Sequence, residues 1–238
     1  DVAYCLPVEY LRQLRAFTDT LKPDFVLMGE TLHGDYNRWM GEGLCHSVTN
    51  YDCFKGLWSS FNDQNLFEIG HSLARQFGPE PWTVYRGAHL LSFLDNHDVE
   101  RIASILRNPE HLQPAYGLLF GMPGVPAVYY GSEWGIQGRK ADGDAALRPA
   151  LERPEWNSLT DWIAALAAAR HLPPTLTHRQ AGPRSSSPAR PTTLAAAVNC
   201  RPAASASGGR SNIFRQDRPG SHRGGFFCRI CPDVTKDA

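Results

Sequence analysis

Apolar positions along residues 1–170 follow two spacings, one typical of helices and one typical of buried strands. Residues 8–21 carry apolar side chains at positions 8, 11, 14, 17 and 21, and Lys22-Pro23 ends this helical stripe. Short apolar runs at 24–29 and 89–95 predict buried strands. The same patterns predict further strands at 45–49 and 125–130, and helices at 52–60, 65–77, 99–107, 109–121 and 158–170. Because strands and helices alternate, the sequence predicts an α/β fold with parallel strands joined by helical crossovers.

The pattern stops after Arg170. Residues 171–238 are rich in Pro, Ser, Arg, Gly and Ala, and they show no sustained period of 2 or of 3.6. Such a composition is typical of a segment without a packed core, so we expect two regions, a folded one at 1–170 and a low-complexity, disordered basic tail at 171–238.

Composition adds a charge asymmetry to this division. The chain is 42% hydrophobic and 20% charged, which is ordinary for a globular protein, and it has no apolar run long enough to span a membrane. Residues 1–170 carry 14 Lys and Arg against 21 Asp and Glu, whereas the tail carries 10 against 3. The basic tail is the only feature of the sequence that favours nucleic-acid binding. We therefore expect neither a nucleic acid nor a membrane as a partner.

The six cysteines predict no metal centre. Cys5, Cys45 and Cys53 fall in the folded region, where we expect free thiols that behave as small hydrophobic residues. Cys228-Arg229-Ile230-Cys231 is a single C-x-x-C motif without a second pair, so zinc and redox roles are disfavoured. We therefore predict no metal ligands.

Two acidic signatures suggest a chemistry. Met28-Gly29-Glu30 ends one predicted strand, and Phe93-Leu94-Asp95-Asn96-His97-Asp98 ends another. Carboxylates at the ends of parallel strands are where barrels of alternating strands and helices keep their active sites, and cleavage of a glycosidic bond needs two carboxyl groups. The alternative is that Glu30 caps a helix and Asn-His-Asp forms a turn.

These signatures resemble the α-amylase family of retaining glycosidases and transglycosylases. Two further blocks carry the resemblance, Asp1-Val2-Ala3 and Gly124-Val125-Pro126-Ala127-Val128-Tyr129-Tyr130-Gly131-Ser132-Glu133. The resemblance covers roughly residues 1–170 and implies part of a (β/α)8 TIM barrel, from about strand four to strand eight. Three strand–helix units of such a barrel are absent, so we expect the isolated chain to be weakly active or inactive. A shifted reading frame would explain why the family's small β domain has no counterpart after residue 170.

The resemblance implies a role for each matched residue. Asp1 would be the nucleophile, Glu30 the general acid/base, and Asp98 the residue that stabilises the transition state. Cys5 stands where many relatives place His or Glu, which argues against a calcium- or substrate-linked role at that position. The residues expected to bind substrate are Asn96, His97, His33 and Arg101, although the position of Arg101 after Asp98 favours pairing with a carboxylate over contact with substrate.

The resemblance implies a hydrolase of α-glucosidic bonds in maltodextrin- or starch-like glucans. The alternatives are a transglycosylase, a sucrose- or trehalose-active relative, and a catalytically inactive remnant that binds glucan. No cofactor is evident from the residues, although a full-length member of the family can bind calcium. An α-glucan is the expected partner. The sequence leaves the oligomeric state open and favours the cytoplasm only slightly.

Overall fold

The computed structural model describes residues 1–170. The predicted tail at 171–238, with its Cys228-to-Cys231 motif, lies outside the described residues, so its predicted disorder stays a prediction.

Within residues 1–170, four short strands pair in parallel. They are β1 (Met28–Gly29), β2 (Ser47–Val48), β3 (Leu91–Phe93) and β4 (Val125–Ala127). Met28 pairs with Ser47, and Leu91 pairs with Val125. A parallel bridge between Thr49 and Leu91 links the two pairs, so the strand order follows the sequence. The four strands lie inside the predicted runs but are shorter.

The segment before β1 differs from the prediction. The resemblance implies that Asp1–Ala3 ends the first of its barrel strands, but η1 (Ala3–Cys5) is a short 3-10 helix. Val2 has φ 42°, a left-handed conformation that is rare for a β-branched residue. The backbone N–H of Ala3 nevertheless donates to the carbonyl of Glu30 at 2.8 Å, so this segment lies beside the end of β1.

The helices follow the apolar pattern closely. They are α1 (Val8–Leu21), α2 (Tyr51–Asn62), α3 (Phe67–Phe77), α4 (Ile102–Ile105), α5 (Leu112–Gly121), α6 (Asp144–Leu147) and α7 (Ser158–Arg170), with 3-10 turns η2 (Tyr36–Arg38), η3 (Pro109–His111), η4 (Ser132–Trp134) and η5 (Lys140–Asp142). Among these described helices, none is both long and apolar enough for a bilayer crossing.

The predicted helix at 99–107 is the main error. Only α4 forms there, because the N–H of Arg101 donates to the carbonyl of Gly138 and its ψ of 136° is not helical. The carboxylate of Asp95 then accepts from the N–H of Ile102 at 2.8 Å, so the helix begins at Ile102.

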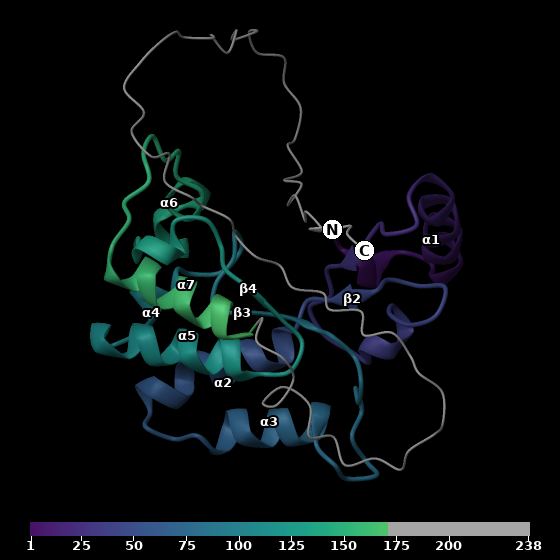
Figure 1. The fold of residues 1–238 in the computed structure, drawn as a ribbon, viewed down its shortest axis with the longest axis horizontal. Helices are drawn as coiled ribbons and strands as arrows, with labels where there is room; N and C mark the ends of the chain where they lie inside the picture. Colours follow the sequence, from purple (N-terminus) through teal and green to yellow (C-terminus); the bar gives the residue numbers. More distant parts are fainter. Residues whose placement is uncertain (171–238) are drawn as a thin grey trace, which may run out of the picture. The chain divides into compact units, whose positions relative to one another are not determined.

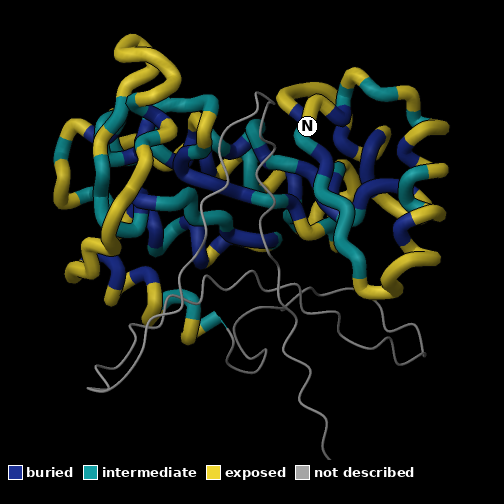
Figure 2. The backbone as a smooth tube through the Cα atoms, turned by 90° about the horizontal axis from the view of Figure 1, so that it is seen from above, coloured by how far each residue is buried: buried dark blue, intermediate teal, exposed yellow. Residues whose placement is uncertain are grey.

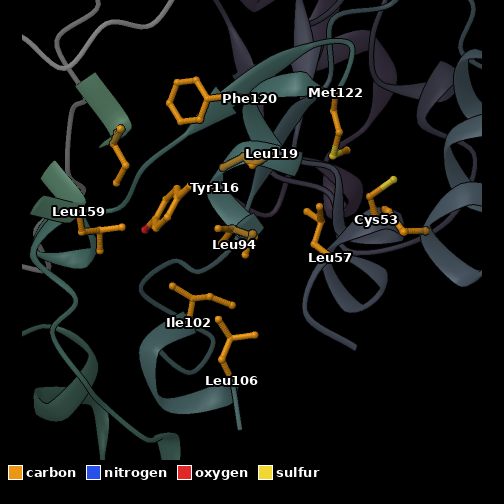
Figure 3. Close-up of a cluster of buried hydrophobic side chains, with 13 residues drawn as sticks. Cys53, Leu57, Leu94, Ile102, Leu106, Tyr116, Leu119, Phe120, Met122 and Leu159 are labelled. Carbon is orange, nitrogen blue, oxygen red and sulfur yellow. The ribbon is translucent and has the colours of Figure 1, made fainter. Parts of the chain in front are cut away.

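The main hydrophobic cluster lies between the helices and the ends of β3 and β4. Helix α2 contacts α3 and α5, and α5 contacts α7 (Figure 1). Leu57, Leu94, Tyr116 and Leu119 gather in this cluster (Figure 3), and each of them is at most 1% exposed. A second cluster joins α1 to β2 and includes Leu11. Figure 2 shows the buried residues inside and the exposed ones on the outer loops.

Gly124 allows β4 to approach β3. Its φ is +95°, and a Cβ at this position would collide with the carbonyl oxygen of Leu90. That oxygen accepts the N–H of Val125 at 2.8 Å, at the start of the β3–β4 pairing. A residue other than glycine would disturb the strand pair that leads to the second acidic signature.

Candidate active site

The two acidic signatures meet where their strands end. Glu30 follows β1, and the turn that contains His97 and Asp98 follows β3. One carboxylate oxygen of Glu30, one of Asp98 and a ring nitrogen of His97 all lie within 4.8 Å of one another. The three side chains are only partly buried or exposed, so a ligand can reach them. We call Glu30, His97 and Asp98 the acidic cluster.

The first residues of the chain contact Glu30. Its Oε2 accepts the N–H of Val2 at 3.1 Å, and its carbonyl accepts the N–H of Ala3. The backbone next to Asp1 therefore lies at Glu30. The Asp1 side chain is exposed, and its carboxylate is not a member of the acidic cluster.

Asn96 holds the turn rather than facing a ligand. Its Oδ1 accepts the N–H groups of Asp98 and Val99 at 2.8 and 3.1 Å, and its Nδ2 donates to the hydroxyl of Tyr51 at 2.8 Å. The protein thus uses both ends of the amide, which leaves His97 and Asp98 as the members of the motif that are open to a ligand.

Asp98 has cationic neighbours that the sequence analysis missed. Arg148 donates from Nη2 to Oδ1 of Asp98 at 2.8 Å and from Nε to the carbonyl of His97 at 3.2 Å. Lys140 Nζ donates to the Asp98 carbonyl at 3.1 Å. The other carboxylate oxygen, Oδ2, lies 3.2 Å from Nε2 of His97. Lys140 lies in η5 and Arg148 directly after α6, in a part of the sequence where no motif marks a functional residue.

A buried polar network lies behind the turn. Asp95 is 2% exposed, and its Oδ2 accepts from the hydroxyl of Ser132 at 2.7 Å as well as from Ile102. Burial raises the pKa of Asp95 to about 6, while these hydrogen bonds and the charge of Arg101 oppose the rise. The network ties the end of β3 to the segment after β4.

Arg101 belongs to this network and not to the ligand surface. Its side chain is fully buried and donates to the carbonyls of Tyr130 and Leu147, both at 2.7 Å, and to Ser132 Oγ at 2.9 Å. Its guanidinium carbon lies 4.1 Å from the centre of the Tyr129 ring. The predicted substrate contact is therefore wrong for Arg101 in this structure, because no part of it reaches the surface.

The charges of the acidic cluster act on two tyrosines, Tyr51 and Tyr4, and His33 lies beside Tyr4. Burial raises the pKa of Tyr51, and the charges of Glu30 and Asp98 add to the rise while its hydrogen bond with Asn96 opposes it. Desolvation, Cys5 and Glu30 raise the pKa of Tyr4, whose ring lies 5.4 Å from that of His33. His33 itself is exposed.

Among the described residues, the acidic cluster is the one group of three or more His, Cys, Asp and Glu side chains able to share a metal ion. Calcium takes six to eight oxygen ligands, mainly from carboxylates and carbonyls. A histidine nitrogen beside two carboxylates, with Arg148 and Lys140 already bonded around Asp98, does not fit that ion.

The comparisons with known proteins agree on one family. A family model for the alpha amylase catalytic domain matches residues 6–170. The intracellular maltogenic amylase of Bacillus subtilis (strain 168) is 28% identical over 141 residues, which are 58% of this chain and 24% of that protein. Neopullulanase 2 of Thermoactinomyces vulgaris is 29% identical over 184 residues, which are 74% of this chain and 30% of that protein. The chain thus spans about a quarter to a third of the length of these relatives.

Solved structures give the same result. The ligand-free cyclic alpha-maltosyl-(1→6)-maltose hydrolase of Arthrobacter globiformis superimposes with a TM-score of 0.61 at 26% identity, over 75% of this chain and 41% of that one. The same enzyme in complex with maltose gives a TM-score of 0.59 at 26% identity, over 71% of this chain and 38% of that one. The parallel strands and helices described above therefore correspond to part of a TIM-barrel-like catalytic domain.

Proposed function

Because this chain belongs to the α-amylase catalytic-domain family, we propose that it carries the acid/base part of a retaining glycoside hydrolase that cleaves α-glucosidic bonds. The acidic cluster is the observation that carries the proposal. It places two carboxylates and an imidazole within 4.8 Å of one another at the ends of parallel strands, where barrel enzymes hold their catalytic groups.

Glu30 is the proposed general acid/base. As an acid it protonates the oxygen of the leaving sugar, and as a base it then takes a proton from the attacking water. Its Oε2 accepts one backbone N–H, from Val2, which orients the carboxyl group.

Asp98 and His97 are the proposed sugar-binding pair. The Asp98 carboxylate accepts hydrogen bonds from ring hydroxyls, and its negative charge stabilises the oxocarbenium-like transition state. His97, whose side chain is 47% exposed, offers a further ring nitrogen to the same hydroxyls. Asn96 contributes by holding the turn, as its hydrogen bonds to the backbone indicate.

Asp1 is the proposed nucleophile. Retaining glycosidases place the nucleophile and the acid/base about 5–5.5 Å apart. The contacts of Val2 and Ala3 with Glu30 support this assignment, because they bring the backbone beside Asp1 to the acid/base residue. In this assignment the segment at Asp1–Ala3 and β1 to β4 correspond to strands four to eight of the barrel.

The proposed substrate is an α-linked maltooligosaccharide. The support comes from the relatives, which are named as maltogenic amylases and a neopullulanase, and from a structural neighbour solved with maltose. The same carboxylates serve hydrolysis and transglycosylation, so the products must be analysed in the test.

Because the isolated chain is expected to have little activity, the proposal is tested with Glu30→Gln in a full-length barrel that contains this segment. Hydrolysis of maltotriose should fall by about 10²–10⁴, because the amide cannot transfer a proton, while maltotriose still binds. Glu42→Gln, at an exposed glutamate outside the acidic cluster, is the matched control and should behave as the unchanged barrel.

Three results would contradict the proposal. Glu30→Gln with more than half of the parental turnover would remove Glu30 from the role of acid/base. Products longer than maltotriose would show transglycosylation instead of hydrolysis. Binding of maltotriose without any cleavage by the full-length barrel with Glu30 in place would identify an inactive glucan-binding remnant.

A further inference from the structure

Arg148 contacts the acidic cluster from a distant part of the sequence. It lies directly after α6, 50 residues from Asp98, and its Nη2 donates to Oδ1 of Asp98 at 2.8 Å. The other oxygen, Oδ2, lies 3.2 Å from His97 Nε2. The two contacts together fix the rotation of the carboxylate. We propose that Arg148 is a positioning residue that holds Asp98 in the orientation that a sugar ring requires, an inference that rests on the proposed function.

Arg148 is itself held on both sides. The carbonyl of the preceding residue, Leu147, accepts a hydrogen bond from Arg101 Nη2 at 2.7 Å. The carbonyl of the following residue, Pro149, accepts one from the hydroxyl of Tyr130 at 3.0 Å. Because the backbone is fixed before and after Arg148, its side chain is presented to Asp98 from a rigid support.

The support reaches into the protein interior. Arg101 is fully buried, stacks on the ring of Tyr129 and bonds to Ser132, which in turn bonds to Asp95. A continuous set of contacts therefore runs from Asp95 through Ser132 and Arg101 to the loop that presents Arg148. The segment that follows β4 therefore holds both ends of the turn at residues 95–98, Asp95 through Ser132 and Asp98 through Arg148.

The turn needs this support because its own bonds fix only its backbone. Asn96 binds the N–H groups of Asp98 and Val99 but does not touch the carboxylate. A catalytic group displaced by about 1 Å can cost on the order of 100-fold in rate. An ion pair as exposed as this one, with 42% and 43% of the two side chains accessible, adds little to the stability of the fold. Its contribution therefore lies in the geometry of Asp98.

The test compares Arg148→Ala and Arg148→Lys with Arg153→Ala in the same full-length barrel. Arg153 is an exposed arginine of the same loop and serves as the matched control. For Arg148→Ala, the turnover of maltotriose should fall on the order of 100-fold with little change in KM, and millimolar guanidinium should restore part of it. Arg148→Lys should keep an intermediate turnover. A lysine carries the same charge, but it can replace only one of the two hydrogen bonds that Arg148 donates, to the Asp98 carboxylate and to the His97 carbonyl.

A second measurement does not depend on turnover. In a crystal structure of Arg148→Ala the Asp98 carboxylate should take a different rotamer, while the backbone of the turn, which Asn96 holds, stays in place. An unchanged orientation of the carboxylate would overturn the proposal, and so would an unchanged turnover. A lower KM with the same kcat would also overturn it, since Arg148 would then compete with the sugar for Asp98. If the full-length barrel cleaves nothing, the proposed function fails, and the crystal structure still decides the role of Arg148.

Discussion

Replacing Asp95 by Asn should change how the stability of the protein depends on pH, because the Asp95 carboxyl group is buried. Burial raises its pKa from 3.8 to about 6, in spite of hydrogen bonds from Ile102 and Ser132 and the nearby charge of Arg101. Asn keeps the size and one acceptor oxygen of the side chain, but it has no proton to lose.

The sign and the magnitude follow from these two pKa values. Between pH 3.8 and about 6 the folded state keeps a proton on Asp95 that the unfolded state has lost. The stabilisation from this group is therefore complete below pH 3.8 and disappears as the pH rises through about 6. The two pKa values differ by roughly two, and each step of one is worth about 1.4 kcal/mol, so the loss is about 3 kcal/mol.

Urea unfolding at several pH values between 3.5 and 7.5 would measure this loss. The free energy of unfolding of Asp95→Asn, minus that of the unchanged chain, should rise by about 3 kcal/mol across the range. Taking the difference cancels the groups that titrate alike in both proteins. It also separates the pH effect from any constant cost of packing the amide.

Ser92→Ala is the control, because Ser92 is buried in β3 and has no group that titrates in this range. Its difference from the unchanged chain should be the same at every pH. A flat difference for Asp95→Asn as well would refute the argument, since the Asp95 carboxyl would then titrate alike in the folded and unfolded states.

Two further predictions concern the strand pair and the thiols. Gly124→Ala should lower the free energy of unfolding by about 1–3 kcal/mol, because the φ of Gly124 is +95° and the new Cβ meets the Leu90 carbonyl. The control, Gly121→Ala, places its Cβ in open space at the end of α5 and should not destabilise the protein in this way. Equal losses of stability in the two variants would contradict the argument. Iodoacetamide at pH 7.5 should modify Cys5 in the native protein and Cys53 only after unfolding, because Cys5 is exposed whereas burial raises the pKa of Cys53 to about 12. The masses of the labelled peptides would show which thiol has reacted. Equal labelling of both cysteines in the native protein would refute this prediction.

The sequence predicted the elements whose structure depends on local signals. Helix α1 has the bounds that the apolar spacing and Lys22-Pro23 indicated. Helix α4 is much shorter than predicted, because a long-range bond between Arg101 and Gly138 overrides its helical pattern. Propensity and spacing carry no information about a partner 37 residues away, so this error was not avoidable from the sequence.

The residues of the candidate site likewise divide into those that local sequence signals reveal and those whose place depends on contacts distant in the sequence. Glu30 and Asp98 each end a predicted strand, and parallel strands bring such ends together, so their meeting could be foreseen. Arg148 could not be, because it lies in a polar loop with no period and reaches Asp98 across 50 residues. Arg101 was misassigned because its position after the motif says nothing of its burial.

Arg101 also determines where the loop after β4 can vary. It fixes the loop at Tyr130 and Ser132 on one side and at Leu147 on the other. Residues 141–145, between these fixed points, are all exposed. Changes of length tend to be tolerated at exposed loop tips whose backbone makes few contacts. Within it, the exposed Gly143 between η5 and α6 is therefore where designed variants can gain residues, while the turn with His97 and Asp98 stays in place.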